Sequence, residues 1–348
     1  MKPSTDRQGA AALGILEKSF SLLILLCMAA GLLLGRVVPQ IGPALEPLIP
    51  VGLFLMIYPT VTKVPFGEIR RAATEKRPAG LSVFLNYIVN PLLLYAFGWL
   101  FLRDQPELWT GLILLGIAPC IGMVLVWADL GGADNPLSVA LMAWNSLIQI
   151  VSVPVWILLL VGTKVPMEAG VVLRSTFLYL VLPLLAGALT RRIVLRRKGL
   201  TWFQARLVPA LGTLQFIALL ATLVLMFALK GDVILRQPEL IVLMAAPLVL
   251  FFLTLFNIGY WVGRLFGLSR DKAVTVGFHV TGRNFELSIA LAIAAFAAAP
   301  LVAVSTVVGP LIEVPTMLGL VWFARRLPGV HSQVGAHESA RVTPAGGN

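Results

Sequence analysis

The stretch GIAPCIGMVLVWADLGGADNP (Gly116–Pro136) interrupts one of the long apolar runs of this 348-residue chain. Pro119 lacks the backbone N–H that an α-helix would use, and Cys120 follows it directly. Asp129 and Asp134 flank a Gly-Gly pair, a combination typical of helix caps and turns. We therefore predict a helix that breaks at Pro119, begins again after Cys120 and ends in a polar turn before Pro136.

The rest of the chain is strongly apolar. Hydrophobic residues make up 58% and charged residues 12% of it, and the mean hydropathy is +0.91. Soluble domains carry about 25% charged residues, and continuous apolar runs of about 20 residues are typical of membrane-spanning helices rather than of β-barrels. We predict an all-α polytopic membrane protein with ten transmembrane helices, at 19–38, 43–62, 79–101, 108–127, 136–161, 168–190, 208–229, 239–266, 272–298 and 300–324.

The net charge of +11 reflects membrane orientation. Counted over the segments between spans, 20 Lys and Arg residues fall on one side and 5 on the other. Because basic loops stay in the cytoplasm, we expect both termini to be cytoplasmic, in a cell (inner) membrane. This distribution gives no reason to expect a nucleic-acid partner.

The sequence shows weak internal similarity when it is aligned with itself at an offset of 164 positions. The shift aligns Pro119–Gly122 with Arg283–Glu286, and Gln149 with Glu313. Five spans per half would give two inverted repeats, about 19–161 and 168–324, between a cytoplasmic segment 1–18 and a disordered tail 325–348. Interrupted helices at matching positions of two halves indicate a transporter site, so we expect helices four and nine to be discontinuous, with breaks at Pro119 and Gly282.

Ionisable residues inside spans need a partner or a function. Arg283 and Glu286 are three positions apart, and we expect them either to form a structural ion pair or to face a substrate. Glu313, between Pro310 and Pro315, is expected to carry protons or to have a structural role. Cys120 is either a small buried hydrophobe or a soft ligand at the start of a half-helix.

These residues carry a resemblance to a known family. CIGMVLVWADLGGADNP (Cys120–Pro136), NFELSIALAIA (Asn284–Ala294) and GPLIEVP (Gly309–Pro315) resemble the arsenical-resistance permeases of the bile acid/arsenite/riboflavin transporter superfamily. The resemblance implies two crossing, unwound helices, and a core domain of spans three to five and eight to ten that moves against a panel domain. It also implies that Cys120 is the essential thiol and that Glu286 and Glu313 are functional acids.

The chain departs from the family pattern at both predicted breaks, and Ala128 also stands where the family usually has asparagine. Pro119 stands where the family usually has arginine before the cysteine, and Arg283 stands where it has a small or amide residue. We interpret this as an arginine that has moved from the first repeat to the counterpart position in the second repeat. The alternative is that the substrate has changed.

The resemblance implies a secondary transporter that extrudes arsenite, and antimonite as a further substrate, by proton antiport. We expect Cys120, Arg283, Asn284 and Glu286 to bind the substrate, with Cys120 as the ligand of As(III), and Glu286 and Glu313 to couple protons. The alternative on the same fold is a sodium-coupled organic-anion symporter in which Arg283 pairs with the anion. A receptor or enzyme would need a module that the short loops do not offer, so we expect neither catalysis nor a cofactor.

Overall fold

The computed structural model describes residues 22–23, 26–27, 29–38, 40, 44–45, 48–63, 74–162, 169–236, 238–296 and 299–328, and nearly all of them are helical. The named helices, with three short π-helical segments (η), are α3 (Ile49–Lys63), α5 (Lys76–Phe84), η2 (Leu85–Val89), α6 (Asn90–Phe101), α7 (Pro106–Ile117), α8 (Val124–Leu130), α9 (Asn135–Leu160), α10 (Ala169–Thr176), η3 (Phe177–Val181), α11 (Leu182–Trp202), η4 (Phe203–Leu207), α12 (Val208–Arg236), α13 (Pro238–Leu265), α14 (Arg270–Thr281), α15 (Phe285–Ala295) and α16 (Pro300–Arg326). Each predicted span from residue 43 onward coincides with one of these helices or with consecutive ones. The segment 1–18 and residues 329–348 lie outside the described residues, as does part of the span 19–38.

Length and composition make this a membrane protein. In the described part, five helical stretches are long and apolar enough to cross a bilayer: Lys76–Phe101, Asn135–Leu160, Gly170–Leu229, Glu239–Leu265 and Leu301–Arg326. The third of these stretches turns at Gly199, where φ is 78°, a conformation that suits glycine. Large apolar side chains such as Trp99, Leu159 and Leu265 are exposed on the outside, as a lipid-facing surface requires. The chain is therefore an all-helical polytopic membrane protein.

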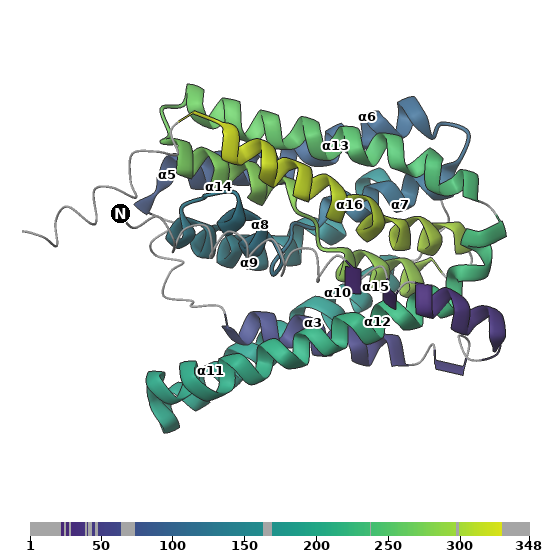
Figure 1. Ribbon diagram of the computed structural model, residues 1–348, viewed down its shortest axis with the longest axis horizontal. Helices are drawn as coiled ribbons and strands as arrows, with labels where there is room; N and C mark the ends of the chain where they lie inside the picture. The colour runs from purple at the N-terminus through teal and green to yellow at the C-terminus, as the bar shows by residue number, and fades with distance from the viewer. Residues whose placement is uncertain are drawn as a thin grey trace, which may run out of the picture.

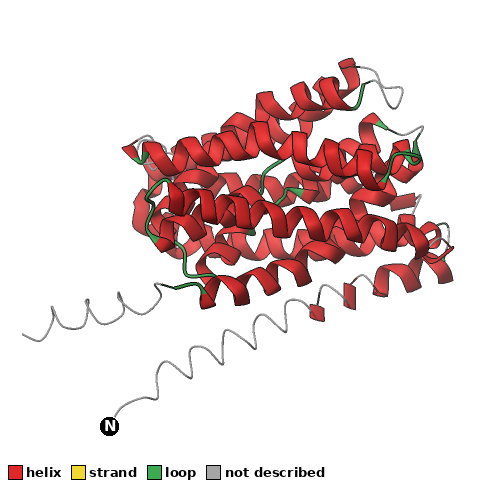
Figure 2. Ribbon diagram, turned by 90° about the horizontal axis from the view of Figure 1, so that it is seen from above, coloured by secondary structure: helices red, strands yellow, loops and turns green. Residues whose placement is uncertain are grey.

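Two helices are broken inside the bundle. α7 ends at Ile117 and α8 begins at Val124, while α14 ends at Thr281 and α15 begins at Phe285. The short loop segments at the breaks lie within the bundle (Figure 2). α7 packs against α15 and α8 packs against α14, so each half-helix contacts the opposite half of the other broken helix.

The two breaks are joined by backbone hydrogen bonds. The N–H of Cys120 donates to the carbonyl of Gly282 at 3.0 Å, and the N–H of Asn284 donates to the carbonyl of Ala118 at 2.9 Å. Between these bonds, Pro119 and Arg283 form an isolated antiparallel bridge. Ala118 is extended, as expected of a residue that precedes proline. The crossing is thus fixed by main-chain pairing within a helical protein.

One side of the bundle is formed by α3, α11 and α12. α3 packs against both of the other two helices, and the three lie together along the lower edge of Figure 1. α12 and α3 also contact α16 and α15 respectively. This side therefore faces the broken helices and closes the space next to them.

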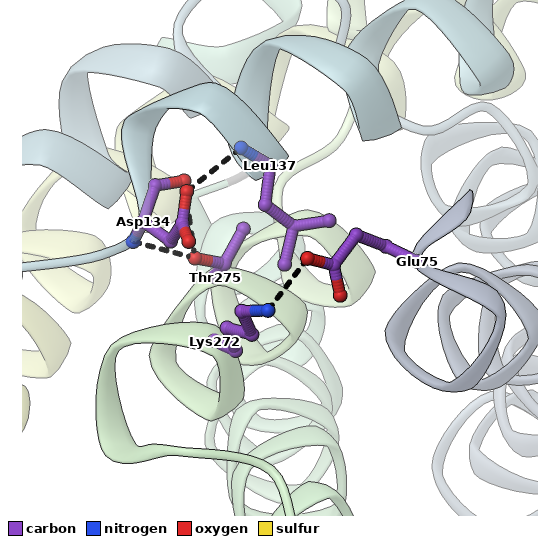
Figure 3. Close-up of polar contacts among 5 residues, drawn as sticks. All are labelled: Glu75, Asp134, Leu137, Lys272 and Thr275. Carbon is purple, nitrogen blue, oxygen red and sulfur yellow. Dashed lines mark hydrogen bonds and ion pairs between the residues drawn. The ribbon is translucent and has the colours of Figure 1, made fainter. Parts of the chain in front are cut away.

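The polar turn after α8 is a cap. The Asp134 carboxylate accepts a hydrogen bond from the N–H of Leu137 at 2.9 Å and so caps the N-terminus of α9. The Asp134 N–H donates to Thr275 on α14 at 2.9 Å, and Lys272 pairs with Glu75 at 2.6 Å (Figure 3). The predicted turn-forming role of Asp134 is confirmed.

Candidate functional site

A cavity lies beside the crossing. Its volume is about 70 Å³, which is room for a few water molecules or one small solute. Of the predicted site residues it brings together Cys120, Arg283, Glu286 and Glu313. The sequence thus predicted residues that share one cavity although they come from three separate stretches of the chain.

Cys120 lies in the break between α7 and α8. It is 7% exposed, and its thiol is free. Gly282 lies across from it, and a Cβ atom at Gly282 would come 3.3 Å from the Cβ of Cys120. Because φ of Gly282 is −63°, the backbone itself does not require glycine there. Gly282 leaves space beside the thiol and ends α14 as its extended C-cap.

The Arg283 guanidinium is buried and turned toward helix ends. Nε donates to the carbonyl of Thr281 at 2.9 Å, and Nη1 donates to the carbonyl of Gly116 at 2.8 Å. Nη2 donates to the carbonyl of Val280 and to Oδ1 of Asn86, the latter at 2.8 Å. One side chain therefore satisfies carbonyls at the C-termini of both α7 and α14, where helix dipoles favour a positive charge.

Of the two alternatives for Arg283 and Glu286, the structural ion pair is wrong. Arg283 is in the extended segment before α15, whereas Glu286 is in the first turn of that helix. Helical i, i+3 spacing does not apply across such a boundary. Among the described residues no ion pair joins Arg283 to Glu286 or to Glu313 at salt-bridge distance.

Two carboxyl groups border the cavity. Glu313 on α16 is 5% exposed and accepts a hydrogen bond from the backbone N–H of Arg283 at 3.3 Å. Glu286 is partly exposed and follows Asn284, the N-cap of α15. A carboxylate in a first helical turn is stabilised by the helix dipole. The cavity thus holds one thiol and two carboxyl groups on separate elements.

Asn284 has a structural role, and its role in substrate binding stays a prediction. Its Oδ1 accepts a hydrogen bond from the N–H of Leu287 at 3.1 Å, whereas its Nδ2 has no protein partner. Asn284 does not line the 70 Å³ cavity, unlike the other predicted substrate ligands. The amide therefore caps α15 beside the site.

A larger space, which we call the vestibule, adjoins the cavity. This space of about 620 Å³ shares Met56, Met123, Leu219 and Glu286 with the cavity. It extends along α3 to Lys63, seven residues from Met56, which corresponds to about 10 Å of helix. Lys63 donates a hydrogen bond to Gln215 on α12 at 2.7 Å. The vestibule thus lies between the cavity and the end of the bundle that the basic residues predict to be cytoplasmic.

The α3 and α12 side of the cavity was missed in the sequence. Met56 comes from α3, and Leu219, Thr222, Leu223 and Met226 form a stripe along α12. The spacing of three to four residues marks a single helix face, but the same spacing occurs on lipid-facing and packed faces. Only the tertiary contact with the breaks distinguishes this stripe.

In the part of the chain that the structure describes, no three His, Cys, Asp or Glu side chains cluster closely enough to hold a metal ion. The residues that line the cavity include one thiol, that of Cys120. A thiophilic solute would therefore meet one thiol here together with oxygen and thioether groups.

Comparisons with known proteins agree with this architecture. Residues 50–237 match the Sodium Bile acid symporter family. The chain is 38% identical to the arsenical-resistance protein Acr3 of Corynebacterium glutamicum, over 91% of this chain and 90% of that protein. It is 30% identical to Acr3 of Alkaliphilus metalliredigens, over 90% and 93% of the two chains. It is 26% identical to a probable sodium/metabolite cotransporter, the chloroplastic BASS2 of Oryza sativa subsp. japonica, over 94% and 75%. The chain belongs to the Sodium Bile acid symporter family of membrane transporters, in its branch of arsenical-resistance permeases.

Proposed function

We propose that the chain extrudes arsenite from the cytoplasm in exchange for protons. The observation that carries the proposal is one cavity, at the crossing of two broken helices, lined by the Cys120 thiol and by two carboxyl groups, Glu286 and Glu313. The similarity to two arsenical-resistance proteins supports arsenite as the substrate. We propose antimonite as a further substrate.

The chemistry of the cavity suits this cargo. Arsenite near neutral pH is mostly the uncharged trihydroxide, which needs hydrogen bonds and a soft ligand rather than a strong field. Sulfur ligands suit such a thiophilic centre. The Cys120 thiol adds to As(III) and displaces one hydroxyl group, which leaves as water with the thiol proton. Water reverses this step on release, and a single As–S bond keeps the exchange reversible.

The carboxyl groups provide the coupling. When deprotonated, Glu286 accepts hydrogen bonds from the hydroxyl groups of the substrate. Protonation of Glu286 or Glu313 from the outside removes acceptors and favours release. Glu313 also accepts a hydrogen bond from the backbone N–H of Arg283 at the crossing. A change in the charge of Glu313 therefore changes a contact of the crossing itself. This linkage would make proton entry and arsenite exit parts of one cycle.

Alternating access follows from the arrangement of the helices. We propose ten transmembrane helices in two inverted repeats, about 19–161 and 168–324, in a cell inner membrane with both termini cytoplasmic. α3, α11 and α12 belong to the panel and move against the core around the crossing. The vestibule that ends at Lys63 supports an arrangement open to the cytoplasm.

A sodium-coupled organic-anion symporter is the second candidate. The family match and the similarity to the rice cotransporter favour it. That function would use Arg283 to pair with the anion, but its guanidinium donates to three carbonyls and to Asn86. The contacts of Arg283 therefore favour arsenite over an organic anion.

Arsenite uptake into everted vesicles tests the proposal. Vesicles from cells that lack other arsenite exporters are acidified inside, and uptake is measured with the chain and with an empty vector. We expect chain-dependent uptake that a protonophore abolishes and that sodium does not change. Uptake that requires a sodium gradient, or none with arsenite, would contradict the proposal.

A further inference from the structure

The cavity has a concentration of sulfur beyond Cys120. Met56, Met123 and Met226 line the same 70 Å³ space, and they are three of the nine methionines of the chain. Met56 and Met226 are 4% and 1% exposed. Four sulfur-bearing side chains therefore surround a space that admits one small solute.

The sulfur atoms come from both sides of the cavity. Cys120 and Met123 belong to the break between α7 and α8, whereas Met56 is on α3 and Met226 is on α12. A solute in the cavity is thus bordered by sulfur from the broken helix and from the side that faces it. Thr222 on α12 adds a hydroxyl group beside Met226.

Thioether groups differ from leucine in what they recognise. Both side chains fill apolar space, but the methionine sulfur is polarizable and belongs with the soft ligands that favour thiophilic centres. It cannot form the covalent bond that a thiolate forms, so it adds attraction without trapping the cargo. The attraction is stronger for a heavier and more polarizable metalloid centre.

We infer that Met56, Met123 and Met226 form a thioether shell that sets specificity for soft trivalent metalloids and favours antimonite over arsenite. The inference rests on the proposed function and adds residues that determine its selectivity. Cys120 supplies the reversible bond, Glu286 the hydrogen bonds to hydroxyl groups, and the shell discriminates between the two cargoes.

The test is the triple variant M56L/M123L/M226L in a Cys27→Ser background. Leucine keeps the volume of methionine closely, and Cys120 is then the one thiol of the chain, which has two cysteines. Purified protein is alkylated at Cys120, and the concentrations of antimonite and of arsenite that halve the alkylation rate are measured. Met317→Leu is the matched control, because Met317 is buried beside Gly282 and does not line the cavity.

We expect the half-protecting concentration of antimonite to rise about tenfold in the triple variant. This is near the lower end of the loss of affinity, about 10- to 100-fold, that follows when groups around the direct ligands of a metal are replaced. The value for arsenite should change less, and Met317→Leu should change neither. Equal weakening for both metalloids, or no change, would overturn the thioether shell and leave the proposed function intact. If neither metalloid protects Cys120 in the Cys27→Ser parent, the proposed function fails and the shell fails with it.

Discussion

Pro119 and Arg283 face each other in an antiparallel bridge between the two broken helices. They are also counterparts under the 164-residue shift of the sequence. An inverted repeat relates its halves by a pseudo-two-fold axis in the membrane plane, and residues next to such an axis face their own counterparts. The bridge therefore supports the proposed inverted repeat more directly than sequence identity does.

Replacement of Arg283 by alanine should destabilise the crossing. Its guanidinium bonds to carbonyls at the ends of α7 and α14 and to Asn86, and each buried group left without a partner costs about 1–3 kcal/mol. We expect a loss on the order of 3 kcal/mol or more and a clearly lower melting temperature in detergent. Arg283→Lys should recover only part of it, since an ammonium group lacks the planar fork that reaches several carbonyls.

An arginine on the opposite strand of the bridge should restore part of this stability. Pro119→Arg in the Arg283→Ala background places the charge at the counterpart position, close to the same helix ends. We expect a higher melting temperature than for Arg283→Ala alone, with Pro119→Ala in that background as the control. Equal melting temperatures for the two double variants would show that the positions are not interchangeable.

Cys120→Ser should abolish most arsenite efflux while the fold is kept. Serine is of similar size, but its hydroxyl group is a hard ligand that does not hold a thiophilic centre. We expect efflux to fall about tenfold or more, with an unchanged melting temperature. Cys27→Ser is the matched control and should transport normally, because Cys27 does not line the cavity. Full efflux by Cys120→Ser would remove the thiol from the mechanism.

Asp134→Ala should affect stability and not transport. Asp134 caps α9 through the N–H of Leu137, and loss of such a cap costs about 1 kcal/mol. Beside this turn, Lys272 and Glu75 form an ion pair that is about one-third exposed (Figure 3), and such a pair contributes less than about 1 kcal/mol to stability. Asp134→Ala should therefore lower the melting temperature more than Lys272→Ala does. A large loss of arsenite efflux in either variant would show that this turn belongs to the transport pathway.

The positions of the two breaks were predictable from local chemistry and from the internal repeat. Pro119 cannot donate a helical hydrogen bond and disfavours helical backbone at the residue before it, and the 164-residue shift marked Arg283–Glu286 as the counterpart of Pro119–Gly122. The direction of the Arg283 side chain was not predictable in the same way. Helical spacing suggested Glu286 as its partner, but the extended backbone at Gly282–Asn284 turns the guanidinium toward carbonyls of α7, which are distant in the sequence.

The α3 and α12 side of the cavity could not be predicted from sequence patterns. Met56 and Met226 occupy apolar positions of long helices, where methionine ordinarily fills gaps in packing. Only the contact of α3 with α15 and of α12 with α16 brings these helices to the crossing. Such contacts depend on the assembly of the whole bundle, and no local periodicity encodes them.

Glu313→Gln should separate transport from the proton gradient. The amide oxygen of glutamine can still accept the hydrogen bond from the N–H of Arg283 that Glu313 accepts at 3.3 Å, so the crossing should remain folded. A glutamine cannot take up and release a proton. In everted vesicles we expect parent-level binding of arsenite, but little increase in uptake when the interior is acidified.

Glu286→Gln provides the comparison for that experiment. Glu286 is partly exposed in the first turn of α15 and borders both the cavity and the vestibule. Its loss should weaken arsenite binding as well as coupling, because the hydroxyl groups of the substrate lose an acceptor. If Glu313→Gln retains the full response to acidification and Glu286→Gln loses it, the coupling proton is carried by Glu286 alone, and Glu313 has a structural role.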